Sequence, residues 1–327
     1  MTSLLVLGGT SFVGRHIVEA ALTRGHQVTV FNRGRTNPHL FPQVAHIAGD
    51  RQSGELDALR SGSWDMVVDV SGYYPRQVHE AVDALRERVG HYTFISTVSV
   101  YAPTDDPVDE SSALLPTDGV DTEKVTDDTY GPLKVLCEEA ARSDFPGATV
   151  VRPGIVAGPH DPTGRFTAWV RRATRPGPML ASRPDAPVQV VHARDLAELT
   201  LQVTEQRVPD TFNAVGPTSG GVPMAEVIAA CVEAAGVASP EVVWVDEDLI
   251  TSRDVPLPLF LPRSEHCDGL FRASCRKAEA QGLVNRPLVE TARDTLAWLR
   301  TPGQERAHVE LLSAEQESEI LAAWAAR

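Results

Sequence analysis

The chain has 327 residues, of which 42% are hydrophobic and 23% charged, as in globular proteins large enough to bury a sizeable core. Its formal net charge of −14 disfavours binding to nucleic-acid backbones and to anionic membranes. Four cysteines without CxxC spacing, no apolar run of membrane-spanning length and no signal-peptide pattern predict a cytoplasmic protein without a disulfide scaffold or a metal site.

The first predicted elements are a strand, a tight turn and a helix. An apolar run at 4–7 leads through a glycine-rich turn into a helical pattern. Gly8 permits a tight turn with positive φ, and Gly14 permits close packing of the helix on the strand. Ser11 stands where the usual pattern has its middle glycine. The turn predicts a dinucleotide site, because the N–H groups at the helix start would face a pyrophosphate.

Strands and helices then alternate along the first half of the chain. Further strands are expected at 28–31, 66–70, 92–97 and 148–151, and a short third strand is expected to end near 48–50. An amphipathic helix is expected through Val78, Val82, Leu85 and Val89. This order predicts an α/β fold, a Rossmann-type doubly wound parallel sheet.

The predicted sheet domain covers residues 1–158, and 188–215 return to it. Residues 159–187 and 216–327 are expected to form a smaller C-terminal substrate-binding lobe. That lobe would include a helix at 287–299 and a last helix from Ser313, which starts with a Ser-x-x-Gln pattern.

A strongly acidic segment lies between Thr104 and Asp128, with nine acids against the single Lys124. A solvated surface loop and a mobile flap that disfavours strongly anionic substrates are both consistent with this composition.

Tyr130 and Lys134 stand four residues apart, on one helix face if the first turn begins there, where Pro132 is tolerated. A free phenol has a pKa near ~10 and is a poor acid–base catalyst at neutral pH. The lysine cation and the positive nicotinamide ring of an oxidised cofactor would favour the phenolate and lower that pKa. With five tyrosines and three lysines in the chain, this spacing is expected by chance about 0.05 times.

The ordered motifs resemble those of the extended short-chain dehydrogenases/reductases, also described as NAD-dependent epimerase/dehydratase proteins. The matching segments are 8–14, 96–101, 130–134, 151–154 with 158–159, 191–197 and 212–214. The resemblance covers nearly the whole chain and is specific for fold and cofactor class, less so for the substrate. It implies that Thr97 hydrogen-bonds the reacting oxygen, that Tyr130 moves the hydroxyl proton, and that Lys134 tunes the phenol and holds the nicotinamide ribose.

The resemblance also implies a set of cofactor-binding residues. Asp50 matches the acid that touches the adenine amino group, and 70–72 match the backbone beside the cofactor. The full predicted set is Gly8, Thr10, Ser11, Phe12, Val13, Asn32, Arg33, Asp50, Arg51, Val70, Ser71, Gly72, Tyr130, Lys134, Pro153 and Gly154.

The end of the second strand bears on the choice of dinucleotide. NAD-binding proteins place an acid there to hold the ribose hydroxyls, whereas this chain has Asn32 followed by Arg33. A guanidinium binds a 2′-phosphate bidentately, so NADP(H) is the preferred prediction and NAD the other possibility. Arg33 could also be a solvated turn residue.

Two departures from the family pattern concern the substrate. Val188 and Ile155 stand where nucleotide-sugar enzymes carry an arginine and an asparagine, which puts nucleotide-sugar binding in doubt. Substitute phosphate contacts, if not merely surface residues, would come from the arginines Arg165, Arg171, Arg172, Arg175 and Arg183.

The sequence therefore predicts an oxidoreductase that transfers a hydride between NADP(H) and a carbonyl or alcohol carbon of a small organic substrate. A nucleotide-sugar epimerase or dehydratase with tightly bound NAD is the first alternative, and a cofactor-sensing or RNA-associated protein is the second. The expected partner is a small molecule, not nucleic acid or membrane. A homodimer through helices near 75–89 and 130–143 is consistent with Val78, Val82, Leu133 and Leu136, which could equally face the sheet.

Overall fold

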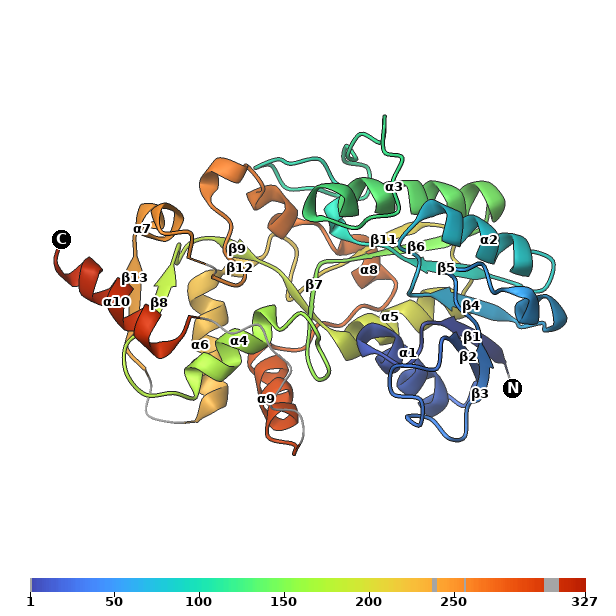
Figure 1. The fold of residues 1–327 in the computed structure, drawn as a ribbon, viewed down its shortest axis with the longest axis horizontal. Helices are drawn as coiled ribbons and strands as arrows, with labels where there is room; N and C mark the ends of the chain where they lie inside the picture. Colours follow the sequence, from blue (N-terminus) through green and yellow to red (C-terminus); the bar gives the residue numbers. More distant parts are fainter. Residues whose placement is uncertain (1, 237–239, 256, 303–311) are drawn as a thin grey trace.

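The computed structural model describes residues 2–236, 240–255, 257–302 and 312–327. Its larger body is a seven-stranded parallel sheet with the strand order β11-β6-β5-β4-β1-β2-β3 (Figure 1). The strands are β1 (Ser3–Leu7), β2 (Gln27–Asn32), β3 (Ala45–Ala48), β4 (Met66–Asp69), β5 (Tyr92–Ile95), β6 (Thr149–Pro153) and β11 (Thr211–Ala214). The predicted doubly wound α/β fold is confirmed, and the strand order reverses at β1, where such sheets bind ligands.

Helices cover both faces of this sheet because both faces are apolar (Figure 1). Leu4 and Val6 of β1 belong to a core cluster that includes residues of α1 (Phe12–Thr23) and α5 (Ala193–Glu205). Leu5 and Leu7 belong to a second cluster with residues of α2 (Pro75–Leu85) and α3 (Asp127–Asp144). Burial on both faces explains why the first strand is a continuous apolar run rather than an alternating one.

A smaller body with its own core lies beside the sheet (Figure 1). The chain first enters it after β7 (Ile155–Ala157) and leaves it through β10 (Val190–His192), and these two strands pair in parallel. After β11 the chain returns to the smaller body. Its elements are α4 (Arg165–Ala173), β8 (Met179–Ser182), β9 (Pro187–Val188), β12 (Val222–Pro223), α6 (Met224–Ala235), β13 (Val242–Val245), α7 (Glu247–Ser252), α9 (Leu288–Leu299) and α10 (Ala314–Ala325).

One part of the range predicted for the smaller lobe packs on the sheet instead. Helix α8 (Arg276–Ala280) contacts the edge strand β11, and Ala273, Cys275, Ala278 and Leu283 join the core cluster of the sheet. This segment covers a strand that would otherwise present an open edge. Residues 237–239, 256 and 303–311 of the predicted lobe lie outside the described residues.

Two predicted boundaries shift by a few residues. Strand β5 ends at Ile95 rather than Thr97, since the Thr97 hydroxyl accepts a hydrogen bond from the Ser99 amide and starts a short 3-10 helix, η2 (Val98–Val100). Helix α2 ends at Leu85, before Val89.

Helix α3 begins at Asp127, three residues before the predicted start, because Thr126 and Thr129 form a capping box. Pro132 therefore lies inside the helix rather than in its first turn. A proline there lacks the N–H that would bond to the carbonyl four residues earlier. The capping box predicted at Ser313 is also present, with Gln316 as its partner.

The acidic segment is tied to the body at several points. Tyr101 and Leu114 form an antiparallel bridge, and Val108 is buried. The Glu110 carboxylate accepts a hydrogen bond from the backbone N–H of Asn213 at 2.9 Å. These contacts favour a solvated surface segment over a mobile flap.

The residues suggested for a dimer contact are used within the chain. Val78, Val82 and Leu133 are at most 1% exposed, packed inside their own subunit, and Leu136 is partly buried. The homodimer therefore remains a prediction without support from these side chains. Within the described residues, no helix has the length and apolar character needed to cross a membrane.

The C-terminal helix depends on one buried carboxylate. Glu317 of α10 accepts hydrogen bonds from the Arg172 guanidinium at 2.8 and 2.9 Å and from the Leu180 amide at 2.9 Å. We expect Glu317→Ala to lower the free energy of unfolding by about 3 kcal/mol, because Arg172 would be left buried and unpaired. Urea unfolding measures this change. Glu319→Ala, at an exposed position of the same helix, is the control and should change stability by less than about 0.5 kcal/mol.

Candidate active site

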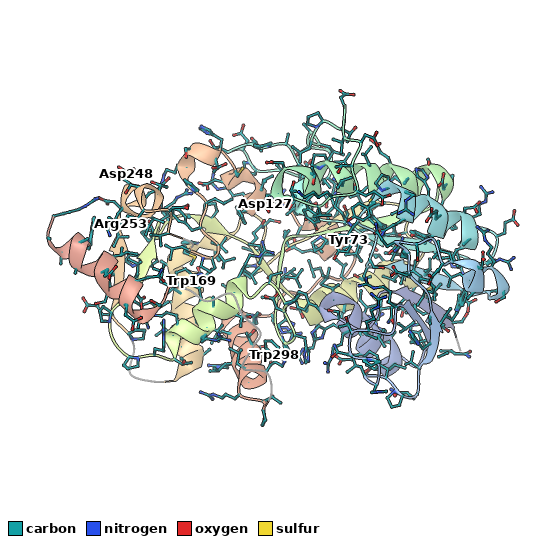
Figure 2. All side chains as sticks on the ribbon, viewed as in Figure 1. Tyr73, Asp127, Trp169, Asp248, Arg253 and Trp298 are labelled. Carbon is teal, nitrogen blue, oxygen red and sulfur yellow. The ribbon has the colours of Figure 1, made fainter. Side chains whose placement is uncertain are left out.

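A cavity of about 1480 Å³ opens at the carboxyl ends of the parallel strands, where residues that follow β1, β4, β5 and β6 meet. Elements of both bodies line it, and the labelled Tyr73 and Asp127 lie on its sheet side (Figure 2). Every residue of the predicted catalytic and cofactor-binding set lines this cavity except Gly72. The fold thus brings together residues that are up to 146 positions apart in the predicted set, from Gly8 to Gly154.

The glycine-rich turn has the geometry that a dinucleotide pyrophosphate requires. Gly8 has φ +101°, and a Cβ on Gly14 would lie only 2.4 Å from the Gly8 carbonyl oxygen. Ser11 is the exposed N-cap of α1, and its side chain makes no capping hydrogen bond, which leaves the helix N-terminus open toward an anion. Phe12 has φ +34°, a strained conformation for a residue with a side chain. These residues fit a dinucleotide.

The side-chain oxygen of Asn32, at the end of β2, already accepts two hydrogen bonds. The donors are the Gly34 amide at 2.7 Å and His46 Nε2 at 2.8 Å, and the side-chain nitrogen of Asn32 donates to Thr10 Oγ1 at 3.2 Å. No acceptor is left there for a pair of ribose hydroxyls. Arg33 and Arg35 line the cavity nearby, both exposed, and no carboxylate of the described residues forms an ion pair with either.

Asp50 and Arg51 follow β3 and differ in what they contact. Asp50 is partly exposed, and its carboxylate accepts the Gln52 amide at 3.0 Å. Arg51 is buried and pairs with Asp69 at 2.6 and 2.9 Å, while it also donates to Ser71 Oγ at 3.1 Å. Its guanidinium therefore holds the turn after β4 in place, and it shapes the cofactor cavity mainly by positioning residues of that turn such as Ser71.

Gly72 is the residue of the predicted set that does not line the cavity. A Cβ there would lie 2.8 Å from both Phe94 and Val78, so the residue faces the core beneath α2 and not the cavity. Its carbonyl oxygen instead accepts a hydrogen bond from Lys134 Nζ at 2.9 Å. Gly72 therefore contributes to the site by holding the Lys134 ammonium in place.

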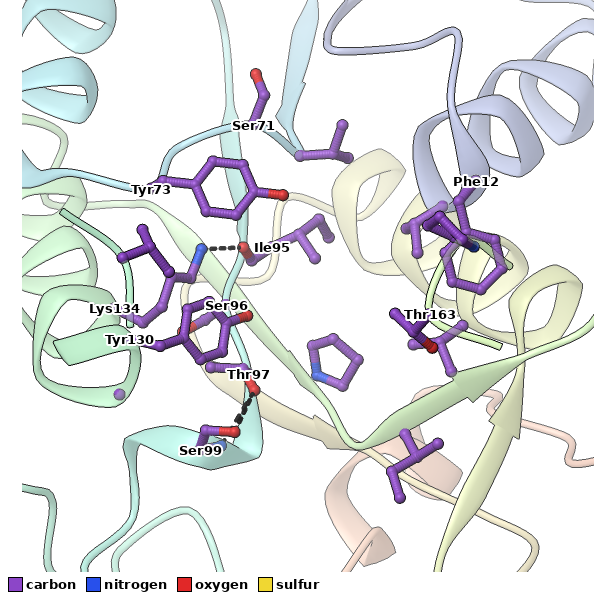
Figure 3. A pocket seen from close by; sticks show the side chains of 18 of the residues that line it. Phe12, Ser71, Tyr73, Ile95, Ser96, Thr97, Ser99, Tyr130, Lys134 and Thr163 are labelled. Carbon is purple, nitrogen blue, oxygen red and sulfur yellow. Dashed lines mark hydrogen bonds between the residues drawn. The ribbon is translucent and has the colours of Figure 1, made fainter. Parts of the chain in front are cut away.

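Lys134 lies beneath the cavity, 4% exposed, on the same face of α3 as Tyr130 (Figure 3). Its Nζ donates to the carbonyl oxygens of Gly72 and Ile95, both at 2.9 Å, and stands 4.1 Å from the centre of the Phe94 ring. Burial lowers the pKa of this ammonium to about 8.

Tyr130 projects into the cavity beside Thr97 (Figure 3). Burial raises the pKa of its phenol, and the neighbouring Tyr73 adds to this, while a hydrogen bond with the Thr97 side chain and the charge of Arg165 act in the opposite direction. The predicted lowering of this pKa is therefore not found in the protein itself. The physical reason is that burial dominates and that the Lys134 ammonium is directed at two carbonyl oxygens.

Sequence reasoning missed the group that supports these residues. Glu138, one turn after Lys134 on α3, pairs with Arg152 at 2.6 and 2.9 Å and accepts the Ser96 hydroxyl at 2.5 Å. Both charges are nearly inaccessible. The spacing of Tyr130, Lys134 and Glu138 at every fourth residue could have revealed this polar face.

The arginines considered as phosphate contacts lie in different environments. Arg172 and Arg183 are buried in ion pairs with Glu317 and Asp268. Of the five, only Arg165 lines the cavity. Val188 is buried in β9, and Ile155 forms part of the cavity wall. The described residues contain no group of three or more side chains that could hold a metal ion.

Comparisons with known proteins agree with this geometry. The model of the NAD dependent epimerase/dehydratase family matches residues 4–216. Chloroplast stem-loop binding protein of 41 kDa b, from Arabidopsis thaliana, is 26% identical over 262 residues, which cover 73% of this chain but only 65% of that protein, less than two thirds of its length.

Solved structures with the same fold cover almost the whole chain. A putative epimerase from Burkholderia cenocepacia J2315 superposes with a TM-score of 0.68 at 20% identity over 91% of this chain and 98% of its own. UDP-glucose 4-epimerase from Thermus thermophilus, in complex with NAD, gives 0.64 at 21% identity over 92% of this chain and 99% of its own.

The buried lysine should make stability depend on pH. The unfolded chain binds this proton up to a pKa near 10.5, whereas the folded protein releases it above about 8, so the free energy of unfolding should rise with pH between these values. We expect wild type to gain about 3 kcal/mol over Lys134→Met across that window. Urea unfolding at pH 7.5 and 10 tests this. Lys277→Met, at a half-exposed lysine, is the control, and an equal pH response in both variants would contradict the expectation.

Proposed function

This chain belongs to the NAD dependent epimerase/dehydratase family, and on that premise we propose that it is an oxidoreductase that transfers a hydride between NADP(H) and a carbonyl or alcohol carbon of a small organic molecule. The observation that carries the proposal is the meeting of Thr97, Tyr130 and Lys134 at one cavity whose glycine turn fits a dinucleotide. When bound, the dinucleotide supplies or accepts the hydride.

The three side chains have separate roles in this proposal. The Tyr130 phenol donates a proton to the carbonyl oxygen when a carbonyl is reduced, and takes it back from the hydroxyl in the reverse direction. The Thr97 hydroxyl, which lies beside the phenol and hydrogen-bonds Ser99 Oγ at 3.1 Å, orients the same oxygen (Figure 3). Lys134 supplies positive charge beneath the phenol and holds the strand ends in place through its two carbonyl contacts.

Removal of the phenol hydroxyl tests the reaction. We expect Tyr130→Phe to lower kcat by at least about a hundredfold, because general acid–base catalysis typically contributes that much, while NADPH binding changes little. Steady-state kinetics and nicotinamide fluorescence measure the two effects. Undiminished turnover in this variant would reject the proposed mechanism and favour a non-enzymatic role.

The preference for NADP(H) is part of the proposal. It is supported by the Asn32 side-chain oxygen, which already accepts two hydrogen bonds and has no acceptor position left for the adenosine ribose hydroxyls. It is also supported by the two exposed guanidinium groups of Arg33 and Arg35 beside it. A 2′-phosphate would give these cations a partner, and the carboxylate that would repel it is absent from position 32.

A titration with both dinucleotides tests this preference. We expect NADPH to bind at least about tenfold more tightly than NADH, a difference of about 1.4 kcal/mol, and Arg33→Ala to remove most of it. Arg88→Ala, at an exposed arginine outside the cavity, is the control. Preferential binding of NADH, or purification with NAD⁺ already bound, would instead favour the epimerase or dehydratase alternative.

An RNA-associated role is the other candidate, since the Arabidopsis relative is named a stem-loop binding protein. The net charge of −14 opposes a phosphate backbone, and the intact set of Thr97, Tyr130 and Lys134 would have no use in such a role. The proposal is therefore of a cytoplasmic enzyme whose partner is a small molecule rather than nucleic acid or a membrane.

A further inference from the structure

Part of the cavity wall is unusually apolar. Residues 257–261 read Leu-Pro-Leu-Phe-Leu, and all five line the cavity. Leu270 and Phe271 line it as well. From this wall and the charges that accompany it, we infer that the substrate is an uncharged, largely apolar carbonyl compound or the corresponding alcohol, and not a nucleotide sugar. The inference rests on the proposed hydride transfer and names the substrate class of the same site.

The backbone of this apolar wall is fixed by buried donors from the smaller body. Trp169 Nε1 donates to the Pro258 carbonyl at 2.8 Å, and the Arg183 guanidinium donates to the Leu261 carbonyl. The two donor side chains are only 1% and 5% exposed. Between these contacts Leu259 has φ +63°, a conformation that a leucine adopts only when its surroundings impose it. The wall is thus a built feature that directs apolar side chains at the cavity.

Apolar side chains also surround the cavity at its exposed rim. Tyr73, Val125 and Leu261 are 48%, 41% and 37% exposed, and all three line the cavity. Exposed large apolar groups gathered at one concave site mark a ligand surface, because a bound apolar molecule removes their area from water. The labelled Tyr73 ring projects over the same space as the Tyr130 phenol (Figure 3).

The charges of the cavity disfavour a diphosphate. Apart from the cations among the predicted cofactor residues and Arg35 beside them, Arg165 is the cation that lines the cavity in the described chain. Besides Asp50 of the predicted cofactor set, three carboxylates line it too: Asp127, Asp128 and Glu265. A nucleoside diphosphate would bring its negative charges among these acids with a single guanidinium to pair with, and such like-charge contacts act against the wrong ligand.

Direct binding tests this inference without relying on turnover. Saturation-transfer NMR on the protein saturated with NADPH would compare 4-phenyl-2-butanone, benzaldehyde and cyclohexanone with UDP-glucose. We expect at least one apolar carbonyl compound to bind, and UDP-glucose not to bind. Binding of UDP-glucose as tightly as the best apolar compound, or binding by none of the apolar compounds, would overturn the inference.

A pair of variants locates the binding surface. Phe260→Ser should weaken binding of the best apolar compound about tenfold, because it removes an aromatic side chain from the wall. Val284→Ser alters a side chain that is 78% exposed and does not line this cavity, so it should leave binding unchanged. Equal affinities in the two variants would refute the role of the wall. An apolar compound that binds but is not turned over with NADPH or NADP⁺ would reject the proposed reaction and leave the substrate class standing.

Discussion

The site depends on two opposite charges buried on one face of α3. Lys134 and Glu138 are 4% and 2% exposed, and burial of an unpaired charge costs several kcal/mol. The lysine is satisfied by carbonyl groups that follow β4 and end β5, and the glutamate by Arg152 of β6 and the Ser96 hydroxyl. Because these partners lie on three adjacent strands, α3 can dock in only one position, and that position places Tyr130, on the same face, beside Thr97.

The cofactor end of the cavity was largely predictable from the sequence because its chemistry is local. The close approach of Gly14 to the Gly8 carbonyl and the identity of residue 32 at a strand end belong to short segments with recognisable spacing. The helix α9 and the Ser313 capping box were predictable for the same reason, since periodicity and caps act over a few residues. The start of α3 was missed because two threonines formed its capping box, whereas the expected pattern ends in glutamate or glutamine.

The substrate end could not be predicted in the same way. Trp169 and Pro258 are 89 positions apart, and Arg183 and Leu261 are 78 apart, so nothing in the local pattern of either segment announces their contact. The arginines show the same limit: Arg165, Arg172 and Arg183 look alike in the sequence, yet two are bound in internal ion pairs and one lines the cavity. The role of a charged side chain depends on its partner, and the tertiary fold determines which partner it meets.

Burial affects the protonation states of the two proposed catalytic groups, Tyr130 and Lys134. It favours the neutral form of both groups that it acts on, so it raises the pKa of the Tyr130 phenol and lowers that of the Lys134 ammonium to about 8. The neutral phenol is the form that donates a proton to a carbonyl oxygen. In the proposed reduction, the neutral Tyr130 phenol would be the proton donor at neutral pH, with Lys134 still charged beneath it. Alcohol oxidation would need the phenolate, whose formation the charge of Arg165 and the Thr97 side chain favour against the effect of burial. The apolar wall would act on Tyr130 in the same way as burial, because apolar side chains do not solvate a phenolate.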